Sequence, residues 1–374
     1  MVFNMRYLDE RVWVILRELR PLIERQHIDI TKWQTKKKLF MRPEEADQDS
    51  MPWEAFDSST DRWYGKDVYY WFRAQFTVPQ SMDGKCIFLK IHTQIEEWDD
   101  GRNPQFLLFV DGKAVQGQDM NHREVRLTDC AEAGRTYTLD LQAYTGILHN
   151  EFALKVTADE TDLALLKLYY DLKAPADAYH YKRMPEGRTR SLLIEALNGA
   201  INKLDLRNPH SPEFDASVAE AQAYIDEHLY QNPELIGHDE IIASCIGHTH
   251  IDVAWWWTVS QTREKTARSF STVLKLMDEY PDYKFMSSQP QLYVFLKERY
   301  PEVYAKIKER VKEGRWIPEG GMWLEADCNL TSGESLVRQF LYGKKFFKDE
   351  FDIDSKILWL PDVFGYSGAL PQIM

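Results

Sequence analysis

Hydrophobic residues recur along the chain with different rhythms, and each rhythm predicts a different kind of structure. Residues 5–27 carry leucine, isoleucine and valine at helical spacing, which predicts an amphipathic helix. Between residues 36 and 158, short alternating runs are separated by turn-forming segments, a pattern typical of an antiparallel sandwich. Within that stretch, the sequence VDGKAV predicts a tight hairpin around Asp111 and Gly112.

The last third of the chain repeats a strand-like run followed by a helix three times, and then begins a fourth run. The runs are EIIASCI, YKFMSS, RWIPEGGMWLEAD and KILWL, and the expected helices cover residues 259–280, 292–313 and 333–349. This order is the signature of a parallel α/β sheet or barrel. Because the sequence ends at Met374, before a helix could follow the fourth run, we expect the N-terminal portion of a longer protein.

Together these patterns predict a multidomain α/β protein. Helical spacing also covers residues 161 to about 230, with a loop expected over residues 174–190. The expected parts are an N-terminal helical segment (1–35), an antiparallel β-sandwich-like domain (36–158), a helical linker region (159–238) and the opening strands of a truncated parallel α/β barrel catalytic domain (239–374).

The charge and composition of the chain argue against several classes of binding partner. Lys and Arg number 46 against 59 Asp and Glu, so the net charge is −13, which argues against a nucleic-acid surface and against docking on an anionic membrane. No apolar run approaches the roughly 20 residues of a membrane helix, and the N-terminus has no secretory pattern. We therefore expect a cytoplasmic protein with no nucleic-acid or membrane partner. The four cysteines form no CxxC pair, which disfavours a thiolate metal site.

Polar clusters follow the first and the fourth strand-like runs. In parallel α/β folds, ligands bind at the carboxyl ends of the strands. His250 and Asp252 follow the first run, and because extended residues alternate faces, their side chains can point the same way. With Asp362 after the fourth run, they make a candidate divalent-metal site. Mixed nitrogen and oxygen ligands favour Zn²⁺, although another divalent cation is possible.

Two alternatives compete with that interpretation. His248 shares the face of His250, so a His-x-His ligand pair would instead indicate an amidohydrolase-like, metal-dependent hydrolase with an activated water. His248 could equally position a ligand or contact a sugar. A second alternative makes the β domain the working part, as a non-catalytic carbohydrate-binding or oligomer-forming module.

Other residues near the predicted strand ends could either contact a ligand or have a structural role. Of the three consecutive tryptophans 255–257, we expect at least one to line the cleft and stack on a sugar, and two to pack in the core or at a domain interface. Glu325 and Asp327 either face the cleft or cap the next helix. Ser287, Ser288 and Gln289 are expected to cap the helix that begins near Pro290.

Four segments in this order resemble glycoside hydrolase family 38, the retaining α-mannosidases. They are GHTHIDVAWWW, FMSSQPQLYVFLKERYPEVYAKIKERVKEGRW, GGMWLEADCNLTSGESLVRQFLYGKKFF and LWLPDVFGYSGALPQ. Upstream, DRWYGKDVYYWFRAQFTVP and VDGKAVQGQDMNHREVRLT resemble the β domain of the cytosolic and bacterial branch of that family. The resemblance therefore covers nearly the whole chain.

The resemblance implies roles for individual residues. It makes His250 and Asp252 zinc ligands, Asp362 the catalytic nucleophile that also binds the metal, and Trp255 an aromatic residue of the sugar subsite. It implies a metal-assisted double displacement that releases terminal α-linked mannose from oligosaccharides. The family's fourth ligand, a histidine, and its acid/base aspartate would lie beyond Met374, so we expect the chain alone to be inactive. A homo-oligomer is left open.

Overall fold

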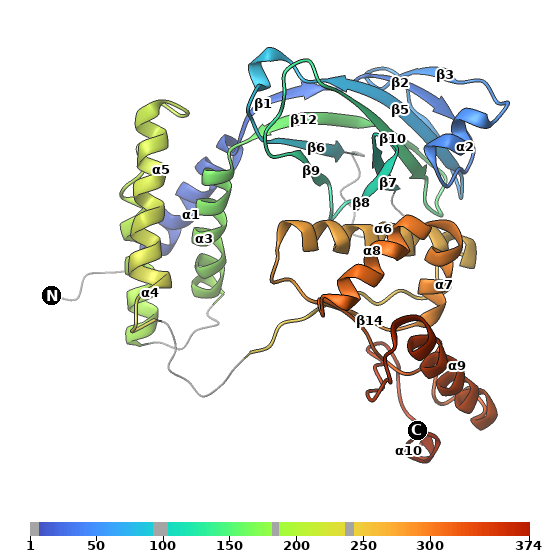
Figure 1. The fold of residues 1–374 in the computed structure, drawn as a ribbon. Coiled ribbons are helices and arrows are strands. Elements are labelled where there is room, and N and C mark those ends of the chain that lie inside the picture. The colour runs from blue at the N-terminus through green and yellow to red at the C-terminus, as the bar shows by residue number, and fades with distance from the viewer. Residues whose placement is uncertain (1–6, 93–103, 182–186, 236–242) are drawn as a thin grey trace.

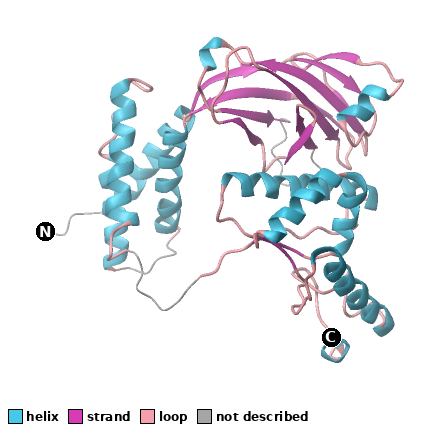
Figure 2. Cartoon of the chain, in the orientation of Figure 1, coloured by secondary structure: helices cyan, strands magenta, loops and turns pink. Residues whose placement is uncertain are grey.

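The computed structural model describes residues 7–92, 104–181, 187–235 and 243–374. Figure 1 shows a group of long helices on one side, an antiparallel β domain above, and a third region of helices around a short parallel sheet. Figure 2 shows the same division by secondary structure. The chain is thus a mixed α/β protein, as its sequence patterns predict. None of the described helices is both long enough and apolar enough to span a membrane.

The helical group joins the start of the chain to a segment that follows the β domain. Its helices bury their apolar faces in one shared core. They are α1 (Leu8–Leu19), α3 (Leu163–His180), α4 (Arg188–Ile201) and α5 (Pro212–Ile225). The N-terminal segment and the helical linker region therefore pack as one unit.

Two details of these helices differ from the sequence predictions. The first helix ends in a 3₁₀ turn at Leu22 rather than at residue 27, because Glu24–Asp29 is strand β1 and pairs with β12. The expected loop is helical as far as His180, although Pro175 lies inside α3. Proline lacks the N–H that would bond the carbonyl of Asp171, and that carbonyl instead accepts from the Tyr230 hydroxyl at 3.0 Å.

The β domain consists of two antiparallel sheets that share a core, with a small two-stranded sheet beside them. One sheet has the order β1-β12-β6-β9 and the other β3-β2-β5-β10-β7-β8. The strands are β1 (Glu24–Asp29), β2 (Lys32–Lys36), β3 (Glu54–Asp57), β4 (Trp63–Gly65), β5 (Tyr69–Thr77), β6 (Ile87–His92), β7 (Gln105–Val110), β8 (Lys113–Gln118), β9 (Glu124–Thr128), β10 (Thr136–Tyr144), β11 (Asn150–Phe152) and β12 (Lys155–Thr161). The helices α2 (Pro43–Gln48) and 3₁₀ Gln80–Met82 lie in its loops.

The hairpin predicted at residues 110–115 is confirmed, and the strands around it explain the contact with the third region. Asp111 and Gly112 both have positive φ, at 48° and 80°, as a tight two-residue turn requires. In β7, Phe106 and Leu108 point into the sandwich core, whereas Leu107 packs against the helices beneath the six-stranded sheet. That sheet is buried on both faces, which explains the unbroken apolar run of β7.

The third region holds a three-stranded parallel sheet of order β13-β14-β15. Its elements are β13 (Gly247–His248), α6 (Val259–Glu279), β14 (Phe285–Ser287), α7 (Pro290–Arg299), α8 (Pro301–Lys312), β15 (Trp316–Pro318), α9 (Gly333–Phe351) and α10 (Leu370–Ile373). A single parallel bridge between Gly320 and Leu358 continues the sheet toward the fourth predicted run. The parallel order agrees with the prediction, and closure into a barrel stays a prediction.

Two boundaries in this region were predicted wrongly. Of the first expected strand, residues 240–242 lie outside the described chain and residues 243–246 are unpaired, so the paired residues are Gly247 and His248. The helix expected over residues 292–313 is two helices, broken at Tyr300. Pro301 disfavours helical geometry at the preceding residue, and Tyr300 has φ −131° and ψ 59°.

The β domain and the third region share a tightly packed junction. Gly117 of β8 lies so close to α6 that a Cβ at this position would come within 2.6 Å of the Cβ of Arg268. The fully buried Glu264 forms an ion pair of 2.8 Å with Arg299, which joins α6 to the end of α7. Helix α6 begins directly after the candidate site loop, so this junction fixes one end of that loop.

Candidate active site

The predicted metal ligands meet at the carboxyl edge of the parallel sheet. His250 and Asp252 lie in the loop between β13 and α6, and Asp362 lies just after the bridge at Leu358. The Nε2 atom of His250 is 3.3 Å from Oδ1 of Asp252 and 3.5 Å from Oδ2 of Asp362. One donor atom from each of the three residues lies within 4.8 Å of the others. The arrangement offers one nitrogen and two carboxylate oxygens to a cation.

A fourth residue, Glu325, holds the other side of the imidazole. Its Oε2 lies 2.7 Å from Nδ1 of His250, and its side chain is only 5% exposed. Its Oε1 accepts hydrogen bonds from the Ser288 hydroxyl at 3.1 Å and from Nε2 of Gln289 at 3.2 Å. Gln289 also donates to the carbonyl of Ile251 at 3.1 Å. Glu325 therefore turns Nε2 toward the two aspartates and ties the site loop to the next two strand ends.

These contacts correct the capping role expected of Ser287, Ser288 and Gln289. Gln289 is the residue before α7, with φ 61°, and its side chain makes no capping hydrogen bond. Asp327, in contrast, takes the structural role: its Oδ1 accepts from the N–H groups of Asn329 and Leu330, both at 2.8 Å, in the turn before α9.

The electrostatics of the cluster favour a bound cation. The ion pair with Glu325 raises the pKa of His250 to about 9, with further support from Asp252. Three carboxylates surround this one imidazole. Within the described residues, His250 supplies all the ion pairs of Asp252, Glu325 and Asp362. Such a concentration of negative charge around a histidine suits a divalent metal with mixed nitrogen and oxygen ligands.

His248 lies apart from the donor cluster. Its Nδ1 bonds the carbonyl of Met286 at 2.9 Å, so this nitrogen carries the proton. Its Nε2 accepts from the indole N–H of Trp359 at 3.2 Å. Both ring nitrogens are thus engaged with neighbouring strands, which disfavours the His-x-His ligand pair of an amidohydrolase-like site. The predicted contact of His248 with substrate stays a prediction.

Exposed aromatic residues follow the cluster residues in the same two segments of the chain. Trp255 and Trp256 are 62% and 46% exposed, so neither packs in the core of this chain, and the predicted packing at a domain interface stays a prediction. Trp257 fixes the loop, because its indole N–H bonds both the carbonyl of Asp252 and the Thr262 hydroxyl at 3.2 Å. Sequence reasoning missed Phe364 and Tyr366, which follow Asp362 and are 86% and 55% exposed. Their proximity to Asp362 in sequence was the available signal.

The comparisons with known proteins bear on this site directly. Residues 240–374, which contain every residue of the cluster, match the family described as the glycosyl hydrolases family 38 N-terminal domain. The chain belongs to glycoside hydrolase family 38.

Relatives of this family 38 chain extend the match into the β domain. Alpha-mannosidase G of Dictyostelium discoideum is 32% identical over 82% of this chain and 28% of its own length. Alpha-mannosidase 2C1 of Homo sapiens is 31% identical over 88% of this chain and 31% of its own length. An alpha-mannosidase of Saccharomyces cerevisiae is 36% identical over 57% of this chain and 20% of its own length. The chain spans less than a third of the length of these relatives.

A solved structure overlaps the chain only weakly. A β-glucuronidase from Ruminococcus gnavus aligns with a TM-score of 0.26 and 10% identity, over 37% of this chain and 30% of that chain. A likeness this small does not define a shared fold.

Proposed function

We propose that this family 38 chain supplies the nucleophile and three metal ligands of a retaining α-mannosidase that removes terminal α-linked mannose from oligosaccharides. The observation that carries the proposal is the convergence of His250, Asp252 and Asp362 at one strand edge, with donor atoms within 4.8 Å of one another. The relatives that cover most of the chain are named α-mannosidases, which supports the choice of sugar.

The donor set fits a divalent metal, which we propose to be Zn²⁺. His250 would bind through Nε2, held in place by Glu325 at Nδ1, and Asp252 and Asp362 would each bind through one carboxylate oxygen. When bound, the cation would supply Lewis-acid contacts to sugar hydroxyls. Trp255, which is exposed and follows Asp252 in the same loop, would offer an apolar ring to one face of the sugar.

Asp362 would carry the covalent chemistry. Its side chain is 48% exposed, so a sugar can reach the carboxylate. In a retaining mechanism, the carboxylate attacks the anomeric carbon while the glycosidic bond breaks and an acid protonates the departing oxygen. Water then displaces Asp362 from the glycosyl-enzyme, giving up its proton to the same acid/base group. We propose that the acid/base residue belongs to the remaining part of the protein.

The metal site can be tested on this chain without any activity. The purified 374-residue protein should bind one Zn²⁺ per chain, measured by elemental analysis after dialysis and by competition with a chromogenic chelator. His250→Ala and Asp252→Asn should abolish stoichiometric binding. His122→Ala is the matched control, because His122 also pairs with an aspartate, at 3.1 Å, but lies in the β domain. Equal loss of zinc in the control, or unchanged binding in both site variants, would contradict the site.

The reaction is tested on the whole gene product. It should hydrolyse an aryl α-mannoside with retention at the anomeric carbon, followed by NMR of the first product. Asp362→Asn should reduce hydrolysis to the background rate. Metal binding without cleavage of any α-mannoside would refute the proposed substrate and leave the metal site standing, whereas full activity of Asp362→Asn would refute the nucleophile. The cytoplasmic location stays a prediction, and a homo-oligomer stays an open alternative.

A further inference from the structure

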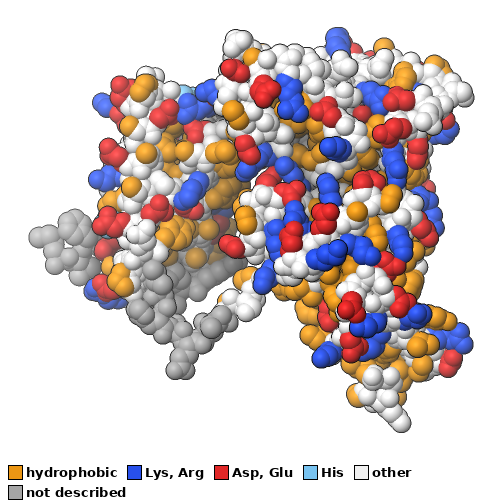
Figure 3. Space-filling view, in the orientation of Figure 1, with side chains coloured by type: hydrophobic (Ala, Val, Ile, Leu, Met, Phe, Trp, Pro, Cys, Tyr) orange, Lys and Arg blue, Asp and Glu red, His pale blue; other side chains and the backbone are white. Residues whose placement is uncertain are grey.

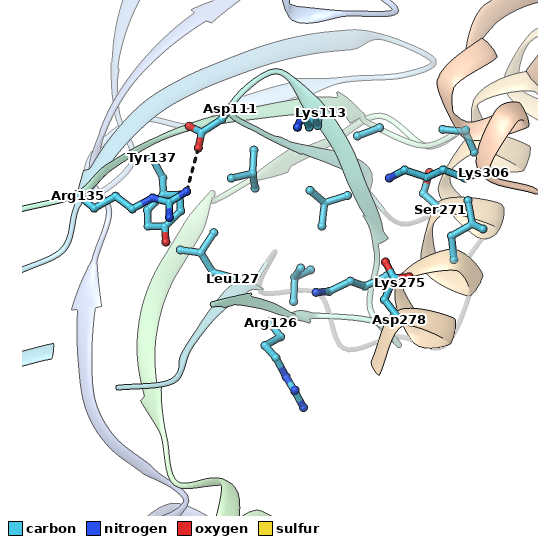
Figure 4. Close-up of a pocket in the computed structure, with 16 residues that line it drawn as sticks. Asp111, Lys113, Arg126, Leu127, Arg135, Tyr137, Ser271, Lys275, Asp278 and Lys306 are labelled. Atoms are coloured by element: carbon cyan, nitrogen blue, oxygen red, sulfur yellow. Dashed lines mark ion pairs between the residues drawn. The ribbon is translucent and has the colours of Figure 1, made fainter. Parts of the chain in front are cut away.

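A pocket separate from the metal cluster lies in the junction between the β domain and the helices (Figure 4). The β7–β8 hairpin, β9 and the start of β10 form one side, and helices α6 and α8 form the other. Its volume is about 420 Å³, within the range of small-molecule sites. None of its lining residues belongs to the candidate active site.

The lining of this pocket is basic in a chain that is acidic overall. Five cationic side chains and two carboxylates line it, whereas the whole chain has a net charge of −13. The cations are Lys113, Arg126, Arg135, Lys275 and Lys306, and the carboxylates are Asp111 and Asp278. A concave surface of one sign concentrates ligands of the opposite charge.

Because carboxylates lie close to both arginines, the lysines supply the positive charge that can bind a ligand. Arg135 lies 3.9 Å from Asp111, and Arg126 pairs with Asp129 at 2.9 Å and points away from the pocket in Figure 4. Lys275 is partly compensated by Glu279 at 3.4 Å. Among the described residues, neither Lys113 nor Lys306 has a carboxylate partner. Asp278 does not offset them, because it pairs with Arg310 outside the pocket.

Figure 4 shows how these lysines are presented. Lys275 and Lys306 extend from the two helices toward the strands, and Lys113 stands at the end of the hairpin. The floor between them is apolar and includes the buried residues Val125, Leu274 and Val303. A ligand that fits both features has an anionic group and an apolar body.

A buried hydroxyl in the pocket wall gives a second, independent indication of a ligand site. Ser271 lies on α6 in the pocket wall, beside Lys306 in Figure 4, and is only 2% exposed. Its Oγ has no hydrogen-bond partner among the described residues. A buried hydroxyl left unbonded is unfavourable, and a ligand oxygen could accept its hydrogen bond.

We propose that this junction pocket binds a small organic phosphate. The phosphate lies among Lys113, Lys275 and Lys306, and the apolar part of the ligand rests on the floor formed by α6, α8 and β9. Separate ammonium groups act as point charges, which suits a phosphate with nearly two negative charges better than a single carboxylate. The proposal is independent of the proposed hydrolase activity, because it uses none of the metal-cluster residues.

The test uses phenyl phosphate as the probe, because it joins a phosphate to a flat apolar ring. Isothermal titration of the purified chain should show saturable binding in the millimolar range or tighter. Lys275→Ala/Lys306→Ala should weaken binding at least about tenfold, the effect of losing roughly 1.4 kcal/mol. The control is Lys297→Ala/Lys308→Ala, which removes the same charge from two lysines that pair with Glu350 on the outside of α7 and α8. Equal weakening in both double variants, or no saturable binding, would overturn the proposal.

Two further measurements separate the parts of the site. Ser271→Ala should weaken phenyl phosphate binding a few-fold without lowering the melting temperature of the free chain, because the hydroxyl has no partner to lose. A fall in melting temperature with unchanged affinity would assign Ser271 to packing and overturn its role. Benzoate and inorganic phosphate should both bind more weakly than phenyl phosphate. If inorganic phosphate binds equally well, the apolar floor takes no part and an organic phosphate is refuted.

Discussion

Removing the cationic partner of a buried glutamate at the domain junction should produce a large and pH-dependent loss of stability. The change is Arg299→Met, which keeps much of the aliphatic volume and deletes the guanidinium. Arg299 donates to Oε1 of Glu264 at 2.8 Å, and the Glu264 side chain is completely buried. Its second oxygen, Oε2, has no hydrogen-bond partner in the part of the chain that the structure describes. Arg299 is therefore the main compensation for this carboxylate.

The structure sets the expected size of the effect. Breaking a buried ion pair by removing one partner typically costs about 3–5 kcal/mol, since an uncompensated charge remains inside the protein. The buried Arg268 still acts on Glu264 from the same helix, so we expect the lower end, about 3 kcal/mol. An exposed pair provides the contrast: Arg338→Met removes a partner of Glu334, both more than half exposed, and should cost about 0–1 kcal/mol.

The sign of the pH dependence follows from the burial of Glu264. Burial raises the pKa of this carboxyl above its ordinary value, and Arg299 and Arg268 partly oppose that rise. Without Arg299 the folded-state pKa rises further. A carboxyl whose folded pKa exceeds its unfolded pKa stabilises the fold fully below the unfolded pKa, and that contribution is lost as pH rises through the folded pKa. The variant should therefore be penalised more at about pH 8 than at about pH 5.

Urea unfolding followed by tryptophan fluorescence measures both effects. The wild type, Arg299→Met, Arg338→Met and the double variant Arg299→Met/Glu264→Gln are compared at the two pH values. The double variant should recover part of the loss at the higher pH, because it no longer buries a charge. A cost for Arg299→Met equal to that of Arg338→Met, or one that does not change with pH, would refute this account of the junction.

Three further predictions concern the site and its support. Glu325→Ala should lower the zinc affinity about 10- to 100-fold. The affinity is measured by chelator competition above pH 9, where the His250 imidazole is uncharged with or without this carboxylate. The control Glu334→Ala should leave the zinc affinity unchanged, and equal losses in the two variants would contradict the positioning role of Glu325. Gly117→Ala should cost about 1–3 kcal/mol in thermal unfolding, because its Cβ would meet Arg268 at 2.6 Å; a neutral result would show that β8 can shift. Trp255→Ala should raise the KM of the whole gene product for an aryl α-mannoside about 2- to 10-fold, equivalent to about 0.5–1.5 kcal/mol of ring contact, with zinc binding intact; unchanged KM would exclude the ring from the sugar subsite.

The sequence predicted the features that depend on local pattern. The β7–β8 hairpin follows from Asp111 and Gly112, which accept positive φ between two apolar runs. The meeting of His250, Asp252 and Asp362 follows from the rule that parallel strands end at one edge, even though 110 or more residues separate the first two from the third. The helix predicted over residues 292–313 was wrong at Pro301, although proline restricts the residue before it and so carries a local signal for the break.

What the sequence did not reveal depends on contacts between distant segments. The sequence predicts caps at Ser288 and Gln289 and leaves Glu325 open between the cleft and a cap, because polar side chains after a strand suit a cap equally well. Their observed contacts depend on the position of His250, which lies in the loop after the neighbouring strand β13. The left-handed backbone at Gln289 has no sequence signal, because glycine and asparagine usually take that conformation.

Helix α9 exposes apolar side chains that its sequence pattern alone would assign to a buried face. Helix α9 has an amphipathic pattern, yet Val337 and Leu341 are 45% and 59% exposed. On the face drawn in Figure 3, hydrophobic side chains lie among charged side chains of both signs on the C-terminal helices.

The pairing of β1 with β12 makes the β domain an insertion within the helical unit. Glu24 lies opposite Thr161, so the domain leaves α1 and returns to α3 at neighbouring points. Helix α1 cannot bury its apolar face until α3 to α5 have emerged from the ribosome, long after its own synthesis. Folding of the helical unit must therefore close a loop that contains an entire domain, a slow, non-local step. Prior folding of the β domain would hold the two ends of that loop together and remove most of the entropic cost of closing it.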